Sequence, residues 1–346
     1  MSNSGLYLAI EVDGDGAHPA AWRRAAHAPD QLLTPRRVRS VATIAENAGF
    51  TLATVDDDLL PPGDGPNPAG RIGAVERAAF IAAATSTLGV APTVSTTYTE
   101  PFHVSSQLAS IDHISTGRAG WAVSQSAGAA AARAWGRPLV EDRAREARDS
   151  TRVVRDLWDS WEDDAVIRDV ATSRYLDRDR LHYIDFTGET FAVKGPAIVP
   201  RPPQGQLVVF APEGLLPADL VDVTLTNATA RAATPLTFTE IEVALDTGSA
   251  TAAQRIADLG PWPDRGRLRY TGPADGLIKL LTDLAGAVDG ARLHPLVLDE
   301  DLAVLSRLVV PALLRSRIAA RPVPGASLRT TLGLARPASR FQETAR

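Results

Sequence analysis

Polar side chains follow two β-type segments of the chain, at the points where those segments end. Asp57 lies in an acidic cluster directly after residues 50–55, and Ser95 and Thr96 end the segment 88–96. Where parallel strands close into a barrel, the active site lies at the carboxyl ends of the strands. A carboxylate and two hydroxyls at such an edge can hydrogen-bond a ligand. The competing explanations are a solvated acidic turn for Asp57 and helix capping for the hydroxyls.

Several kinds of chemistry are excluded by residues that the chain lacks. It has no cysteine, which excludes disulfides, thiolate metal sites, iron–sulfur clusters and a cysteine nucleophile. Its only lysines are Lys194 and Lys279, and neither lies in a phosphate-binding loop or a Schiff-base motif. From these residues we identify no catalytic residue and expect no metal site.

The charge and hydropathy of the chain limit its partners. The formal net charge is -5 and the basic residues form no long block, which argues against nucleic acid as a partner. No apolar run reaches the roughly 18 residues needed to span a bilayer. The first residues, MSNSG, lack the basic and apolar regions of a secretion signal. We therefore expect a cytoplasmic protein that binds neither membranes nor nucleic acid and acts on a small molecule.

Extended and helical patterns alternate along the chain, which is typical of an α/β fold. The expected strands are residues 6–12, 50–55, 88–96, 119–124, 207–211, 221–225, 238–245 and 291–297. The expected helices are 38–48, 70–87, 101–114, 141–161 and 299–316. Eight strands with intervening helices predict a TIM-type (β/α)8 barrel. A doubly wound open sheet is the alternative, and the lack of a G-x-G-x-x-G motif after the first strand argues against it.

One connection is too short for this barrel. Only residues 226–237 separate the expected sixth and seventh strands, and Pro235 interrupts them. A parallel crossover usually needs about a dozen residues or more, with a helix. We therefore predict that the helix after the sixth strand is missing or reduced, unless one of the strands is wrongly assigned.

The chain is expected to form a single barrel domain, 1–346, with two additions. Residues 162–203 are polar and rich in Asp, Arg and Tyr, and we interpret them as an insertion that covers one end of the fold. Residues 319–346 are rich in Pro, Gly and Arg and are expected to wrap around the outside as a C-terminal tail.

Several segments share their residues and their order with one enzyme family. They are AENAGF (45–50), STTYTEPFHVSSQLASIDHISTGRAGW (95–121), LWDSWEDDAV (157–166), PRPPQG (200–205), VDGARLHPLVLDEDL (288–302), LVVPAL (308–313) and LRTTLGLARPASRF (328–341). Together they resemble the bacterial luciferase-like flavin-dependent monooxygenases, in the branch that acts on nitrilotriacetate, dibenzothiophene sulfone and long alkanes. They span most of the chain but do not specify a substrate.

The resemblance implies a cofactor and a partner. The family has a TIM-type barrel, takes reduced FMN from a separate flavin reductase, and inserts one atom of O₂ into a small organic molecule. Asp57 matches the family's acidic residue near the flavin, and Ser95 and Thr96 match its small hydroxyls against the ring. Ser126 keeps the last hydroxyl of the family's W-N-V-V-T-S motif. These four residues are the expected cofactor-binding residues.

The chain departs from the family pattern where the flavin phosphate is held. Ala122 replaces the asparagine of W-N-V-V-T-S, and the family's H-x-x-R-Y carries Val140 and Ala144 in place of the histidine and tyrosine. The family's A-G-S-S after the fifth strand is replaced by a run containing Pro212 and Glu213. Proline removes an N–H donor, and the carboxylate repels a dianion. We therefore expect FMN binding to be weak or lost.

Three interpretations remain open. The first is an active monooxygenase with an altered hold on FMN, because the flavin ring supplies the oxygen chemistry. The second is a non-catalytic barrel with a degenerate flavin site that acts as the partner subunit of an active paralogue. The third is a relative that uses another cofactor, such as a deazaflavin.

In each case we expect a dimer, either a homodimer or a heterodimer with a paralogous barrel. Its contacts are expected on the helices after strands 2 and 3, around Phe80 and Ile81.

Overall fold

Eight parallel strands close into a barrel in the computed structural model, which describes residues 5–60, 70–126 and 128–341. The strands are β1 (Tyr7–Glu11), β2 (Leu52–Val55), β3 (Gly89–Ser95), β4 (Gly120–Ser124), β9 (Val208–Pro212), β10 (Val223–Thr226), β11 (Leu236–Leu245) and β13 (Gly290–Pro295). They pair in that order, and β13 pairs again with β1. The predicted TIM-type barrel and all eight of its predicted strands are confirmed.

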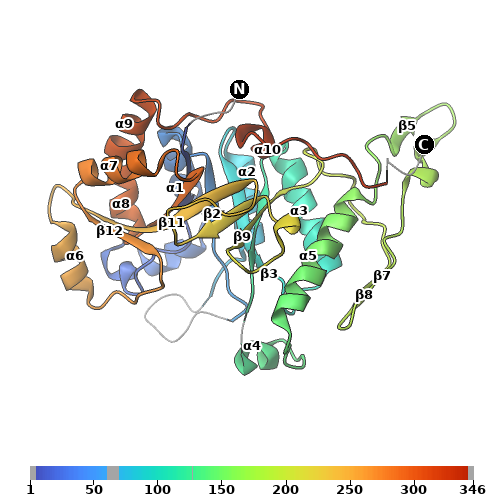
Figure 1. The fold of residues 1–346 in the computed structure, drawn as a ribbon, viewed down its shortest axis with the longest axis horizontal. Coiled ribbons are helices and arrows are strands. Elements are labelled where there is room, and N and C mark those ends of the chain that lie inside the picture. The colour runs from blue at the N-terminus through green and yellow to red at the C-terminus, as the bar shows by residue number, and fades with distance from the viewer. Residues whose placement is uncertain (1–4, 61–69, 127, 342–346) are drawn as a thin grey trace.

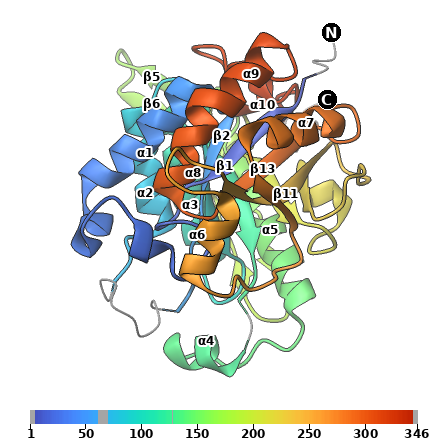
Figure 2. The ribbon, with the colours of Figure 1, turned by 90° about the vertical axis from the view of Figure 1, so that its left-hand side faces the viewer.

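Helices surround the strands, as the two views of Figures 1 and 2 show. They are α1 (Pro35–Ala48), α2 (Ala74–Ala84), α3 (Pro101–Ser115), α4 (Ala129–Ala134), α5 (Arg143–Asp159), α6 (Ala252–Leu259), α7 (Ala274–Leu284), α8 (Leu298–Val304), α9 (Val310–Arg315) and α10 (Leu328–Thr331). The helix predicted over 70–87 begins only at Ala74. The helix predicted over 299–316 is divided by a π-helical turn, Leu305–Val309. Pro311 follows this turn, and its missing N–H cannot continue a regular hydrogen-bond ladder.

The connection from β10 to β11 contains no helix, as predicted from its length. Residues 227–235 form an irregular loop that is held by threonine hydroxyls. Thr224 and Thr234 are hydrogen-bonded at 2.8 Å, and the Thr239 Oγ1 donates to the Ala228 carbonyl at 2.8 Å. The loop can be this short because β10 and β11 are direct neighbours in the barrel.

One strand of the main sheet was not predicted. β12 (Leu268–Gly272) lies outside the barrel and pairs with the second half of β11, beyond the point where β10 ends. Its side chains are half-buried or exposed, so it lacks the continuous apolar run by which the barrel strands were recognised. β12 matters for the site because the loop that precedes it borders the barrel mouth.

The barrel interior changes in character along its axis. At the amino ends of the strands it is apolar, with Tyr7, Phe210 and Phe238 packed together. Leu328 and Leu332 of α10 pack into the same cluster. The C-terminal tail was expected to wrap around the outside, but its helix α10 closes this end of the barrel. Residues 342–346 of the expected tail lie outside the described residues. Toward the carboxyl ends the interior becomes charged, which defines the side on which ligands can bind.

Residues 162–203 form two small antiparallel hairpins beside α5 (Figure 1). They are β5 (Val166–Asp169) with β6 (Arg174–Leu176), and β7 (Phe186–Thr187) with β8 (Ala192–Val193). An apolar cluster that includes Leu157, Trp161 and Val193 attaches this segment to α5. That the segment covers one end of the fold stays a prediction.

Candidate functional site

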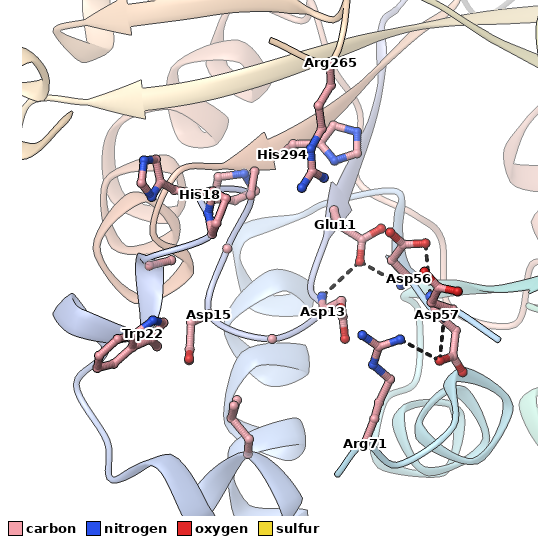
Figure 3. Close-up of a pocket in the computed structure, with 18 of the residues that line it drawn as sticks. Glu11, Asp13, Asp15, His18, Trp22, Asp56, Asp57, Arg71, Arg265 and His294 are labelled. Atoms are coloured by element: carbon pink, nitrogen blue, oxygen red, sulfur yellow. Dashed lines mark hydrogen bonds and ion pairs between the residues drawn. The ribbon is translucent and has the colours of Figure 1, made fainter. Parts of the chain in front are cut away.

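A cavity of about 380 Å³ opens at the carboxyl ends of β1, β2 and β13 (Figure 3). Its lining comes from four parts of the chain: residues 11–22 with Leu32, residues 56–58 with Arg71, residues 265 and 267, and residues 294–295. This is the end of a parallel barrel at which active sites lie. The lining contains acids, arginines and histidines but no serine, threonine, cysteine, tyrosine or lysine. Among the described residues, the cavity therefore offers no hydroxyl, thiol or amine nucleophile, and its carboxylates, arginines and histidines can bind and orient a polar ligand.

The loop after β1 forms one wall of the cavity and is laid directly on the end of β13. The Ala17 amide donates to the Pro295 carbonyl and the Leu298 amide donates to the Asp15 carbonyl, both at 2.7 Å. Gly16 has a φ of +130°, and a Cβ there would lie 2.5 Å from the Leu296 carbonyl oxygen. The close approach of two backbones thus requires glycine at this position. These residues were not predicted to belong to the site, although their place directly after the first predicted strand was a signal for it.

Below the loop, Arg292 connects two carboxylates across the barrel interior. Its guanidinium donates to Glu11 at 2.6 Å, to Glu240 at 2.9 Å and to the Thr54 hydroxyl at 2.9 Å. His294 Nε2 lies 3.0 Å from the same Glu240 oxygen. These residues were not predicted to belong to the site, although each is a polar or charged residue inside or beside a predicted apolar strand.

Burial and charge fix the protonation states of this cluster. Burial, together with the charge of Arg292, lowers the pKa of His294 to about 4, although its bond to Glu240 opposes the shift. Burial would raise the pKa of Glu240, but the hydrogen bond from His294 and the charge of Arg292 outweigh it and lower that pKa. Burial raises the pKa of Glu11 despite the contact with Arg292. At neutral pH, His294 is therefore a neutral donor to an ionised Glu240.

Asp57 lies at the cavity and also supports α2. Its carboxylate accepts from the Ala74 amide at 2.6 Å and from Arg71 at 3.2 Å. Asp57 also lines a smaller neighbouring cavity of about 210 Å³, in which it is joined by Ser95. The structure thus places these two predicted site residues together, and it shows that Asp57 has a structural role as well.

The other predicted hydroxyls are directed at the backbone. The Ser95 Oγ accepts from the Thr97 amide at 3.1 Å, and the Thr96 Oγ1 donates to the Ser124 carbonyl at 3.1 Å. Ser126 follows β4 and does not line either of these two cavities. A flavin-binding role for Asp57, Ser95, Thr96 and Ser126 stays a prediction.

The loop after β9 does not fit a phosphate dianion. The Glu213 amide donates to the Leu225 carbonyl at 2.9 Å and the Leu215 amide to the Pro212 carbonyl at 3.1 Å, so these two N–H groups are already engaged. The Glu213 carboxylate is held there by the Thr226 hydroxyl at 2.6 Å. The loop therefore presents a negative charge where a phosphate site needs N–H or cationic donors.

Comparison with known proteins gives one consistent result. A sequence profile of the luciferase-like monooxygenases matches residues 5–253. N-acetyl-S-(2-succino)cysteine monooxygenase of Bacillus subtilis (strain 168) is 36% identical over 209 residues, which cover 59% of this chain and 47% of that protein. One of the subunits of pristinamycin IIA synthase of Streptomyces pristinaespiralis is 32% identical over 300 residues, 87% of this chain and 89% of that protein.

Solved structures share the fold. EDTA monooxygenase from Chelativorans sp. BNC1 superimposes with a TM-score of 0.80 at 20% identity, over 96% of this chain and 99% of that one. The chain spans about half or less of the length of several curated relatives that it matches, including nitrilotriacetate monooxygenase component A of Aminobacter aminovorans, for which the share is 30%.

Proposed function

Because the chain belongs to the luciferase-like monooxygenase family, we propose that it is a flavin-dependent monooxygenase. It uses reduced FMN from a separate flavin reductase, and O₂, to oxidise a small organic molecule. The observation that carries this proposal is the cavity at the barrel mouth, whose described lining offers carboxylates, arginines and histidines but no hydroxyl, thiol or amine. None of these side chains activates O₂ by itself, and a reduced flavin bound at the cavity would supply the reaction with oxygen.

The names of the relatives support a small organic substrate. They include monooxygenases of N-acetyl-S-(2-succino)cysteine, dibenzothiophene sulfone and dimethyl sulfide. These compounds differ in size and charge, so they indicate a shared reaction type and no shared substrate. We propose that this chain oxidises a small polar molecule, because carboxylates, arginines and histidines line much of its cavity.

The cofactor is proposed to lie near the ends of β2, β3 and β4, where Asp57, Ser95, Thr96 and Ser126 are found. A phosphate placed at the loop after β9, where the family holds it, is repelled by the Glu213 carboxylate. This supports the proposal that FMN binds weakly.

A second candidate function is that of a non-catalytic partner in a larger enzyme. One relative that matches over most of its length is named as a subunit of a synthase, and the loop after β9 does not fit a phosphate. Under this proposal the chain pairs with a homologous barrel that retains the phosphate loop. Ile81, expected in a dimer face, is buried in the chain's own core, so such a face would depend on Phe80 and the exposed parts of α2 and α3.

The cellular location of the chain is also a proposal. No helix within the described ranges is long and apolar enough to cross a membrane. We propose a cytoplasmic enzyme because the chain lacks cysteine and depends on a reductase that supplies reduced flavin.

The test is a flavin titration of the purified chain followed by an oxygenase assay. Oxidised and reduced FMN are titrated, and oxygen consumption is then followed with a flavin reductase, NADH and candidate organic acids. Saturable binding of reduced flavin and substrate-dependent product support the enzyme. Flavin binding or turnover that occurs only after addition of a homologous barrel supports the non-catalytic partner. Failure of reduced flavin to bind in either case contradicts both proposals.

A further inference from the structure

Two arginines border the barrel mouth on the loop between α6 and β12. Arg265 and Arg267 line the cavity at the ends of β1 and β13, and Figure 3 shows Arg265 extending into it between His294 and Glu11. Neither residue was recognised in the sequence, because the short strand that follows them was not predicted.

The loop that carries these arginines is held in place by its own contacts. The Gly266 amide donates to the Asp264 carboxylate at 2.8 Å. Arg269 donates to the Pro263 carbonyl at 2.9 Å and to Glu242 at 2.6 Å, and its guanidinium lies 4.0 Å from the centre of the Trp262 ring. Both ends of the loop are therefore fixed, and the side chain of Arg265 is presented from an ordered turn.

The carboxylates around the cavity already have partners. Glu11 accepts from Arg292 and from the amides of residues 13 and 56. Asp13 is paired with Arg77, Asp15 with His27 and Asp57 with Arg71. These four carboxylates are thus compensated by cations and N–H groups of the chain itself. Within the described residues, Asp56 and Asp58 accept from backbone amides and have no cationic partner.

Within the described ranges neither arginine donates a side-chain hydrogen bond, although Arg267 is ion-paired with two glutamates at longer distance. Within the described ranges, Arg265 has no hydrogen bond or ion pair. Arg267 lies 3.7 Å from Glu240 and 3.9 Å from Glu242, which is longer than a hydrogen bond. Glu240 and Glu242 have their closer partners in Arg292 and Arg269. The guanidinium donors of residues 265 and 267 therefore remain for a ligand.

We infer that Arg265 and Arg267 form an oxyanion-binding subsite at the cavity mouth. A guanidinium offers a planar set of donors that matches a carboxylate or a phosphate. The shared chemistry is a small oxyanion, which is either the carboxylate of an organic substrate or the phosphate of the flavin. The inference rests on the proposed function only in naming these two sources, because the subsite itself is defined by the cavity and its free donors.

The experiment measures binding and needs no turnover. Succinate and inorganic phosphate are titrated into the purified chain by calorimetry, and FMN and riboflavin by fluorescence quenching. The variants are Arg265→Gln, Arg265→Lys and the double variant with Arg267→Gln. Arg315→Gln is the matched control, because it removes an exposed arginine of α9 far from this loop. Circular dichroism and thermal unfolding verify that each variant is folded.

Loss of one charge-assisted contact is expected to weaken oxyanion binding by roughly tenfold to a hundredfold. We expect Arg265→Gln to show this loss, Arg265→Lys a smaller one and Arg315→Gln none. Weaker succinate binding with unchanged FMN binding assigns the subsite to a substrate carboxylate. Weaker FMN binding with unchanged riboflavin binding assigns it to the flavin phosphate.

Two results would overturn the inference. One is that neither anion nor FMN binds more weakly to Arg265→Gln than to Arg315→Gln. The other is that the wild-type chain binds neither anion and does not distinguish FMN from riboflavin. An inactive chain that still binds oxyanions through Arg265 contradicts the proposed function and leaves the subsite standing, so the two failures are distinguishable.

Discussion

The carboxylate of Glu213 sets a measurable limit on FMN binding. It is exposed, lies at the end of β9, and is held by the Thr226 hydroxyl at 2.6 Å. Replacing Glu213 with Gln removes the charge and keeps the shape of the side chain. Replacing it with Ser also restores a hydroxyl of the kind that the family has in this loop. The two variants therefore separate the effect of the charge from that of the lost hydrogen bond.

The magnitude follows from the exposure of the side chain. In water-like surroundings, a single charge at about 6 Å from a phosphate dianion is repelled by roughly 1.4 kcal/mol, which is about tenfold in affinity. Salt screens this repulsion. We expect Glu213→Gln to tighten FMN binding by up to about tenfold at low ionic strength and hardly at all at 1 M salt. Riboflavin, which has no phosphate, is expected to bind equally to both proteins.

The assay is quenching of flavin fluorescence, with FMN and riboflavin in parallel. Asp219→Asn is the control, because it removes an exposed charge from the helical turn that follows the same loop. We expect the wild-type chain to distinguish the two flavins poorly and the control to behave like it. Tight FMN binding by the wild-type chain, with much weaker riboflavin binding and no effect of Glu213→Gln, would refute the assignment of this loop.

Three further predictions concern the stability of the barrel and its association into a dimer. Gly16→Ala places a Cβ against the Leu296 carbonyl and should lower the free energy of unfolding by about 1–3 kcal/mol. Gly14 has open space around it, so Gly14→Ala should lower the free energy of unfolding by less. Thermal unfolding measures both variants. Because the folded-state pKa of His294 is lowered to about 4, its contribution to stability is present above pH 6.5 and is lost as the pH falls toward 4. By linkage, this loss amounts to up to about 3 kcal/mol of unfolding free energy. Denaturant titrations should show a smaller loss for His294→Gln and the full loss for the exposed control His103→Gln. Light scattering at micromolar concentration should give a dimer mass, alone or with a homologous barrel, and a monomer under both conditions would refute the proposed association.

The barrel could be predicted from the sequence because its strands are buried on both faces. Segments such as residues 207–211 are continuous apolar runs, and the missing helix after β10 follows from the length of residues 227–235 alone. β12 could not be found in this way, because its half-buried side chains follow no apolar pattern. The loop that carries Arg265 was missed along with it.

The candidate site was predicted only in part, for a related reason. Asp57 follows a strand and Ser95 ends one, so their place at the barrel mouth could be inferred from chain order. The cluster of Glu11, Glu240 and Arg292 joins residues far apart in the sequence, and only strand pairing brings them together. Each of these charged residues interrupts an apolar strand, which is the signal that would have identified them.

The most direct test of the central claim is binding of reduced flavin to the purified chain. Reduced FMN and reduced riboflavin are titrated anaerobically and followed by calorimetry. We expect saturable binding of both flavins with similar dissociation constants, because the isoalloxazine ring provides most of the binding free energy and the loop after β9 provides none for the phosphate. If neither reduced flavin binds, the chain is not a flavin-dependent monooxygenase.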